Sequence, residues 1–328
     1  MVMAKVSVKP QVVIVTPALR AANNGNWKTA WRWQRHLAER CKVRIVAAWP
    51  DAQASGDQLM IALHARRSAA SIAAWAAEHP GRGLALALTG TDLYRDIQFD
   101  ADAQHSLQRA QILITLQEKA PEALPAEVRG KAQVIYQSTS SRRTLEKSDR
   151  HLRAVMVGHL REEKSPETLF AVARLLAQRH DIQIDHIGAG LDPALAGAAQ
   201  ATMLAAPRYR WLGGLPHETV RRRIQRAHVL IHASRMEGGA HVIIEAVASG
   251  TPVLAARVDG NVGMLGEDYA GYYAWNDAPA LADLLLRCRQ DADFLSRLLA
   301  QCRLRAPLFS PIAERAALRQ VVDDLLES

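Results

Sequence analysis

The sequence has 328 residues, of which 49% are hydrophobic and 23% charged, with 41 Lys and Arg against 33 Asp and Glu. This length corresponds to about two domains that can bury full cores, so the composition excludes a disordered, collagen-like or coiled-coil chain. No apolar run reaches the ~18 residues of a membrane helix, and no long apolar core follows the N-terminal lysines. We therefore expect a cytoplasmic protein without a membrane segment.

Short β-branched and aliphatic runs alternate with amphipathic segments along the first part of the chain, which predicts alternating strands and helices. A polar, basic stretch at 138–153 then interrupts the alternation and is typical of an interdomain linker. The expected strands are 11–16, 43–47, 58–63, 84–88, 111–115 and 133–136, and the expected helices are 27–40 and 66–78.

The alternation restarts after this linker, and from residue 278 onward the pattern is helical with breaks at Pro307 and Pro311. Strand–helix alternation predicts parallel sheets covered by helices on both faces, hence an α/β chain with two doubly wound domains. We expect domains at 1–150 and 151–306, and a C-terminal helix at 307–328 that packs back on the first. The expected strands here are 154–157, 182–187, 209–212, 229–232 and 253–256, and the helices 165–178, 193–204, 217–226 and 239–249.

The most informative segment is 234–252, SRMEGGAHVIIEAVASGTP. Glu237 and Glu245 are eight residues apart, and Glu245 interrupts a helix that is otherwise apolar nearly all round. A buried carboxylate needs partners, which two vicinal sugar hydroxyls or a salt bridge to an arginine could supply. The glycines at 238 and 239 allow a ligand to approach the backbone closely, and the N–H groups of the following helix favour an anion such as diphosphate.

This segment, followed by EAVASGTPVLA and DGNVGML, resembles the C-terminal domain of the retaining glycosyltransferases of the GT-B fold, family 4-like. Three upstream stretches are similar to the same family and occur in its order: VGHL at 157–160 with Lys164, IGAG at 187–190 and WLGGLP at 211–216. The resemblance covers the second domain. It implies two facing Rossmann-like domains with the active site in the cleft between them.

By this resemblance, Glu245 holds the nucleotide ribose, Glu237 meets the donor sugar and Lys164 binds the diphosphate. The family's arginine is replaced by His159, and Arg161 is the other candidate for that charge. His241 stands where the family has a glycine-rich stretch, beside the donor sugar. The implied catalytic residues are thus Glu237, His241 and Lys164, and the implied donor-binding residues are Glu245, His159, Arg161, Gly238, Gly239, Ala240 and Leu215.

The first domain resembles a narrower group, the selenosugar synthases of selenoneine biosynthesis, through TPA at 16–18, NGNWKTA at 24–30 and LTGTDLY at 88–94. This resemblance implies transfer of a sugar from a UDP-sugar, such as UDP-N-acetylglucosamine, to selenophosphate with formation of a C–Se bond. The loop at 23–28 offers N–H groups and an ammonium to such an anion. Asp92 could hold a donor-sugar hydroxyl, orient Lys28 or cap a helix. The implied acceptor residues are Asn24, Gly25, Asn26, Lys28, Thr91 and Asp92.

Metal, cofactor and nucleic acid are not expected, and the UDP-sugar is a substrate. The D-x-D pairs at 100–102 and 291–293 lie at helix starts, where Asp is common as a cap. The cysteines at 41, 288 and 302 form no zinc or disulfide pattern. The arginines at 221–223 and 226 read as a solvated helix face rather than a phosphate track. The alternative functions are an ordinary O-glycosyltransferase acting on a small molecule and a non-catalytic nucleotide-sugar-binding protein.

Overall fold

The structure, a computed structural model, describes residues 9–19 and 25–327 and shows two compact units. The first unit comprises residues 1–137 and 312–328, and the second comprises residues 138–311. The boundary thus falls before the polar stretch at 138–153, which the sequence suggested as a linker and which belongs to the second unit. The chain returns to the first unit after residue 311.

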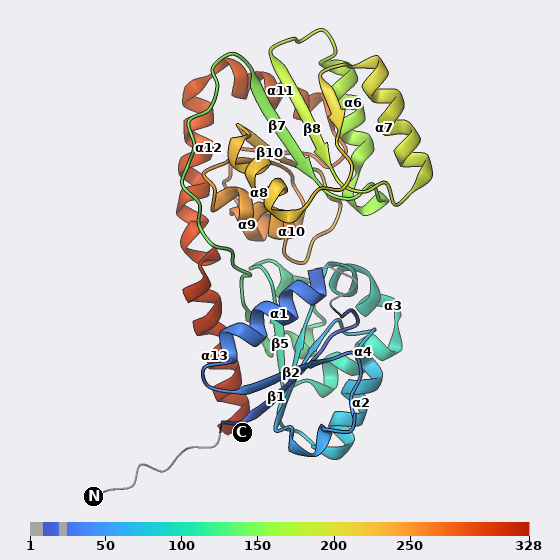
Figure 1. The fold of residues 1–328 in the computed structure, drawn as a ribbon. Coiled ribbons are helices and arrows are strands. Elements are labelled where there is room, and N and C mark those ends of the chain that lie inside the picture. The colour runs from blue at the N-terminus through green and yellow to red at the C-terminus, as the bar shows by residue number, and fades with distance from the viewer. Residues whose placement is uncertain (1–8, 20–24, 328) are drawn as a thin grey trace, which may run out of the picture. The chain divides into compact units, whose positions relative to one another are not determined.

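A six-stranded parallel sheet in the order β2-β1-β3-β4-β5-β6 forms the centre of the first unit (Figure 1). Its strand order reverses between β1 and β3, which is where doubly wound sheets bind ligands at their carboxyl edge. The strands are β1 (Gln11–Val15), β2 (Lys42–Val46), β3 (Leu59–Leu63), β4 (Leu84–Ala87), β5 (Ile112–Thr115) and β6 (Ala132–Val134). The longer helices are α1 (Gly25–Leu37), α2 (Ala69–Glu78), α4 (Ala101–Arg109) and α13 (Pro311–Glu327).

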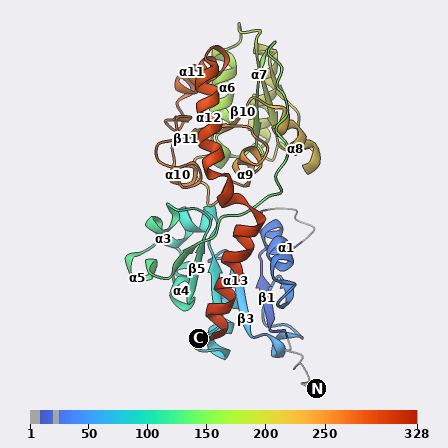
Figure 2. The same cartoon turned by 90° about the vertical axis from the view of Figure 1, so that its left-hand side faces the viewer.

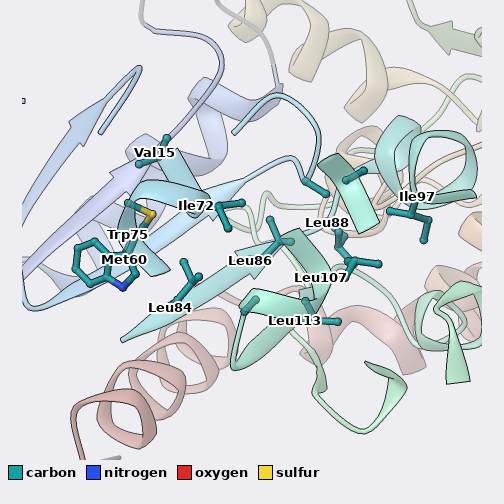
Figure 3. Close-up of a cluster of buried hydrophobic side chains, with 14 of the residues drawn as sticks. Val15, Met60, Ile72, Trp75, Leu84, Leu86, Leu88, Ile97, Leu107 and Leu113 are labelled. Carbon is teal, nitrogen blue, oxygen red and sulfur yellow. The ribbon is translucent and has the colours of Figure 1, made fainter. Parts of the chain in front are cut away.

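Alternate residues of these strands belong to two apolar layers, one on each face of the sheet, because successive side chains of a strand point to opposite faces. Val13 and Val15 join the layer that contains Ile72 and Trp75 of α2 and Leu107 of α4 (Figure 3). The opposite layer combines the remaining strand positions with α1 and α13, which lie side by side on that face (Figures 1 and 2). Helices therefore cover both faces of the sheet.

The second unit contains a second six-stranded parallel sheet, in the order β12-β11-β10-β7-β8-β9, with its reversal between β7 and β10. Its strands are β7 (Leu152–Val157), β8 (Ile182–Ile187), β9 (Tyr209–Trp211), β10 (Val229–His232), β11 (Val253–Ala256) and β12 (Tyr272–Tyr273). Its helices are α6 (Pro166–Leu175), α7 (Pro193–Ala205), α8 (His217–Arg226), α9 (His241–Val247), α10 (Asp259–Leu265), α11 (Ala278–Gln290) and α12 (Ala292–Arg305).

Short helical turns complete both units. They are η2 (Ala54–Gly56), the π-helical turn η3 (Asp92–Asp96), α3 (Ile97–Phe99), η4 (Ala120–Ala123), α5 (Ala126–Arg129), η5 (Glu162–Lys164) and η6 (Ala306–Phe309).

The two doubly wound α/β units predicted from the sequence are confirmed, and most strands begin and end within two residues of their expected bounds. Several local predictions were wrong. The two-residue strand β12 and the helix α10 were not expected. α9 begins at His241, so Gly239 lies in the preceding loop. α1 begins at Gly25, so that residue and the next three form a first helical turn and not a loop.

Asp100 and Asp291 are helix caps, as their positions predicted. Asp100 accepts a hydrogen bond from the Ala103 amide at 2.8 Å, and Asp291 accepts one from the Phe294 amide at 2.8 Å. The three cysteines are buried and unpaired. No helix in the described part of the chain is both long and apolar enough to cross a bilayer.

Candidate functional site

The strongest candidate site lies in the second unit, at the carboxyl ends of β7 and β10. These two strands are neighbours at the reversal point of the sheet, although α6 to α8 separate them in sequence. Lys164 lies in the turn that follows β7, and Glu237 lies in the loop that follows β10. The fold therefore brings these two residues together at the place where a parallel sheet leaves room for a ligand.

Lys164 and Glu237 form an ion pair in which Nζ lies 2.5 Å from Oε1. His232, at the end of β10, places Nε2 3.6 Å from the same oxygen. Burial alone would raise the pKa of the Glu237 carboxyl, but the positive charge of Lys164 holds it below its usual value. Burial lowers the pKa of His232 to about 4, so its imidazole is neutral near pH 7. The pair thus presents an ammonium next to an ionised carboxylate.

Glu245 forms a second cluster on α9. As its apolar surroundings predicted, it is buried, with only 4% of its surface exposed. Its partners are two histidines and not an arginine. His217 Nε2 lies 2.6 Å from Oε1, and His241 Nδ1 lies 3.3 Å from the same atom. Burial opposes ionisation, but these contacts lower the pKa of Glu245 to about 2.

The two histidines contact the same oxygen of the Glu245 carboxylate. Both contact Oε1, and no described group donates a hydrogen bond to Oε2. His241 also lies 3.2 Å from the Ser138 carbonyl oxygen through Nε2. His241 therefore contacts Glu245, and its predicted place beside the donor sugar stays a prediction. His217 was not predicted as a site residue, because nothing in the sequence shows that the start of α8 meets α9.

The ends of β7 and β8, next to Lys164, are closely packed. A Cβ atom at Gly188 would collide with the Gly158 carbonyl oxygen, so only glycine fits between β7 and β8. The exposed His159 accepts a hydrogen bond from the Ala189 amide through Nδ1 at 3.0 Å. That contact fixes the ring at the edge of the sheet. Of the other predicted donor residues, Arg161 is exposed, Leu215 and Gly239 are half-buried, and Gly238 and Ala240 are buried.

The predicted acceptor residues in the first unit differ in position and in exposure to solvent. Gly25, Asn26 and Lys28 lie in the first turn of α1, where Gly25 and Lys28 are exposed. Thr91 is half-buried. Asn24 lies outside the described residues.

Asp92 cannot contact an acceptor, which corrects the prediction for this residue. It is fully buried, and Oδ1 accepts hydrogen bonds from the amide and hydroxyl of Thr89 at 2.7 and 2.6 Å. Oδ2 accepts a bond from the Ala65 amide at 2.9 Å. Asp92 therefore ties the end of β4 to the segment that follows β3. It does not cap the next helix, because its acceptors are satisfied by these three donors.

We expect Asp92→Asn to lower the free energy of unfolding by about 1–3 kcal/mol, because the new amide would turn a donor toward groups that already donate. Urea denaturation followed by circular dichroism measures this loss. Asp100→Asn is the matched control, because asparagine caps helices as well as aspartate does. Equal stability of the two variants would show that the Asp92 network contributes nothing.

His64 is an unusual residue that the sequence did not single out. It follows β3 at the reversal point of the first sheet and has a left-handed backbone, φ 77°. Its buried Nδ1 accepts a bond from the Arg67 amide at 3.4 Å and lies 3.9 Å from Asp92 Oδ2. Nε2 has no hydrogen-bond partner among the described residues. Strain of this kind is concentrated at functional sites, but no periodicity in a sequence reveals it.

The described residues, 9–19 and 25–327, contain no group of three or more His, Cys, Asp or Glu side chains placed to hold a metal ion. The prediction of a solvated face on α8 holds for Arg222 and Arg226, which are exposed, but not for Arg221. Arg221 is buried and donates to the Thr139 hydroxyl at 2.6 Å and the Ser140 carbonyl at 2.8 Å.

Comparison with known proteins identifies the family. The family model described as "Glycosyl transferases group 1" matches residues 137–301, which is half of the chain. The chain belongs to this glycosyltransferase family. The match spans the second unit almost completely, including Lys164, Glu237 and Glu245. No curated protein sequence matches this glycosyltransferase significantly.

Many solved structures share the fold. A sucrose-phosphate synthase from Thermosynechococcus elongatus is 18% identical, with a TM-score of 0.76 over 98% of this chain and 100% of its own. Anabaena HepE, solved with UDP and glucose, is 14% identical, with a TM-score of 0.72 over 98% and 100%. The pneumococcal O-GlcNAc transferase GtfA, solved with UDP and GlcNAc, is 17% identical, with a TM-score of 0.64 over 83% and 58%. At these identities the likeness establishes the GT-B architecture.

Proposed function

We propose that this glycosyltransferase moves a sugar from a UDP-sugar to selenophosphate, and that the second unit binds the donor. The observation on which this rests is the pairing of Lys164 with Glu237 at the reversal point of the second sheet, followed in the next helix by the buried carboxylate of Glu245. One charged group is available there for each part of a sugar nucleotide: Glu245 for the ribose, Lys164 for the diphosphate and Glu237 for the sugar.

The ribose contact follows from the state of Glu245. Its low pKa keeps the carboxylate ionised at neutral pH, and Oε2 accepts no hydrogen bond from the described residues. A ribose hydroxyl can donate to that oxygen in a charge-assisted bond. The choice of UDP is supported by the similar structures of HepE and GtfA, both of which were solved with UDP.

Lys164 is suited to the leaving group. When the bond between the sugar and the diphosphate breaks, its electron pair and a negative charge stay on UDP. An ammonium fixed next to that oxygen stabilises the developing charge without any proton transfer. We infer that Lys164 turns from Glu237 toward the diphosphate when the donor binds. Glu237 then accepts a hydrogen bond from a sugar hydroxyl.

The acceptor assignment rests on the resemblance of the first unit to the selenosugar synthases and on the chemistry of α1. Selenophosphate is a small anion with a strongly nucleophilic selenium, which needs no general base. Its selenium would attack the anomeric carbon, forming the C–Se bond as UDP leaves. The exposed Lys28 and the amide groups of the first turn of α1 favour such an anion.

The decisive experiment is incubation of the enzyme with selenophosphate and each of several UDP-sugars, starting with UDP-N-acetylglucosamine. We expect release of UDP together with a product that has the selenium isotope pattern in mass spectrometry. Because we propose no metal cofactor, turnover should persist in excess EDTA. Sugar transfer to a hydroxyl compound without any selenium product would instead establish an ordinary O-glycosyltransferase. A protein that binds UDP-sugars without transfer would be a binding protein.

We expect Glu245→Gln to weaken UDP binding about tenfold or more, since a hydrogen bond to a charged group contributes roughly 1.5–3 kcal/mol. Isothermal titration calorimetry measures the dissociation constant. Glu218→Gln is the control, because Glu218 is an exposed carboxylate on α8 that pairs with Arg142 and Arg222. An unchanged UDP affinity in a folded Glu245→Gln protein would reject the ribose assignment.

Lys28→Ala should raise the KM for selenophosphate or lower kcat while leaving UDP affinity nearly unchanged, because Lys28 provides a point charge on the acceptor side. Lys42→Ala is the control, since Lys42 is an exposed lysine at the amino end of β2. Normal acceptor kinetics together with a lower melting temperature would mean that Lys28 only stabilises α1.

A further inference from the structure

A cavity of about 550 Å³, largely open to solvent, lies on the surface of the second unit between the segment 143–148 and the beginnings of two strands. This volume is in the range of sites that bind small molecules. Arg153 lies in β7, and Arg226 ends α8 just before β10. The cavity is therefore at the amino ends of the strands, whereas Lys164 and Glu237 follow the carboxyl ends of the same two strands. It is separate from the proposed donor site.

The lining of the cavity is strongly positive. Three of its seven residues are arginines and one is acidic; the residues are Arg143, Thr144, Leu145, Glu146, Ser148, Arg153 and Arg226. The guanidinium groups of Arg143 and Arg226 have no ion-pair or hydrogen-bond partner in the part of the chain that the structure describes. The charge there is thus not neutralised by the protein.

The positive region continues beyond this cavity. A neighbouring cavity of about 300 Å³ shares Arg153 and Arg226 and adds Arg210 and Arg223. These two additional arginines bind the carboxylate of Asp185, at 2.6 and 3.1 Å. Of the two shared arginines, Arg226 has no partner among the described residues, whereas Arg153 donates from Nε to His151 Nε2 at 2.8 Å and keeps its terminal N–H groups for a ligand. The pKa of nearby His151 is lowered by its burial and by four surrounding arginines, in agreement with a positive local field.

The wall formed by segment 143–148 is fixed in place, although it has no regular secondary structure. The Arg143 carbonyl accepts a bond from the Gln225 side chain at 2.7 Å, and the Ser148 carbonyl lies 2.8 Å from His228 Nε2. Lys147 donates to the Gln225 carbonyl at 3.0 Å and also to the Ala227 carbonyl. Burial lowers the pKa of Lys147 to about 8, and these contacts hold it inward.

Thr144 is held on the same wall by close packing. It lies directly against Gly250, where φ is 69° and a Cβ atom would collide with the Thr144 hydroxyl. The cavity is therefore preformed, and a ligand would not have to order the segment. A preformed site loses less binding free energy to ordering.

We propose that this cavity is a binding site for a phosphate-bearing small molecule, held by Arg143, Arg153 and Arg226. Guanidinium groups match the geometry of phosphate oxygens, and the hydroxyl groups of Thr144 and Ser148 can add hydrogen bonds. The lining contains no aromatic residue on which a base could stack, so a compact anion fits better than single-stranded nucleic acid. The site does not depend on the proposed transferase reaction.

The test uses inorganic tripolyphosphate as the probe, titrated calorimetrically into the full chain in the presence of saturating UDP. We expect binding that weakens as salt is added, because the interaction is electrostatic. Arg226→Glu should reduce the affinity at least tenfold. Arg222→Ala is the matched control on the same helix, because Arg222 is exposed and pairs with Glu218 instead of lining the cavity.

Lys164→Met separates this site from the donor site. Tripolyphosphate should bind that variant as it binds the wild type, even if UDP does not bind. Equal affinities of the wild type and Arg226→Glu, no binding at millimolar probe, or loss of binding in Lys164→Met would each overturn the proposal. So would tight binding of a single-stranded RNA that Arg222→Ala and Arg226→Glu weaken equally, because that result would indicate a broad basic surface.

Discussion

Replacing Glu314 by alanine is expected to destabilise the first unit by about 3–5 kcal/mol, the typical cost of removing one member of a buried ion pair. Glu314 is almost fully buried on α13. Its carboxylate accepts hydrogen bonds from Arg32 Nε at 2.8 and 2.9 Å and from Trp33 Nε1 at 2.8 Å. His36 lies 3.2 Å away. Alanine would leave the Arg32 guanidinium without this buried acceptor.

The effect can be measured by thermal and urea denaturation followed by tryptophan fluorescence, to which Trp33 contributes as one of seven tryptophans. For a domain of this size each kcal/mol lowers the melting temperature by about 2–4 °C. Asp323→Ala is the control on the same helix, because Asp323 forms an exposed pair with Arg40. Pairs of that kind contribute about 0–1 kcal/mol. Similar losses in the two variants would show that Glu314 does not hold α13 to α1.

The second large effect is expected for Lys164→Met, which should lower kcat about 10²–10³-fold, in line with the loss of one group that stabilises transition-state charge. Lys164→Arg should restore part of the activity, because it keeps the charge but changes its position. The readout is UDP release from a saturating UDP-sugar. Melting temperatures of all variants show whether the loss comes from chemistry or from unpairing Glu237.

Glu162→Ala is the control for this experiment. Glu162 lies in the same short turn as Lys164, but its side chain is exposed and contacts only Arg235 among the described residues. We expect near-normal turnover from it. Wild-type kcat in the Lys164→Met protein would remove Lys164 from the reaction, whereas equal losses in both variants would point to disruption of the turn.

Much of the fold could be predicted from the sequence, because strands of a buried parallel sheet need continuous β-branched and aliphatic runs. Val229–His232 and Val253–Ala256 have the bounds that such runs predicted. The burial of Glu245 could be predicted for the same reason, since an apolar helix between two buried strands leaves no exposed face. β12 could not be found, because two residues are too short for a pattern.

Asp92 shows that the role of a polar residue could not be predicted from the sequence alone. The sequence places it after a strand, where both a ligand contact and a structural tie are chemically sensible. Asp92 is a structural tie because the Ala65 amide, which follows β3, lies 2.9 Å from its Oδ2 atom and donates a hydrogen bond to it. The burial of Arg221 depends in the same way on Thr139 and Ser140, more than 80 residues earlier. Contacts at such separations are not encoded in local periodicity.

The sequence by itself determined the two α/β units, the positions of nearly all their strands along the chain and the family of the second unit, since these depend on local patterns of polarity and on short motifs. Only the tertiary structure decided which polar groups meet. It brought Lys164 into contact with Glu237 at the point where the strand order reverses, and it gave Glu245 two histidine partners. It also packed α13 onto the first unit, where Glu314 binds Arg32 and Trp33 of α1. Each of these outcomes depends on chain crossings that bring distant residues within hydrogen-bond distance. In a low-dielectric interior, these hydrogen-bond and ion-pair partners determine whether a charged group has a structural role or can bind a ligand.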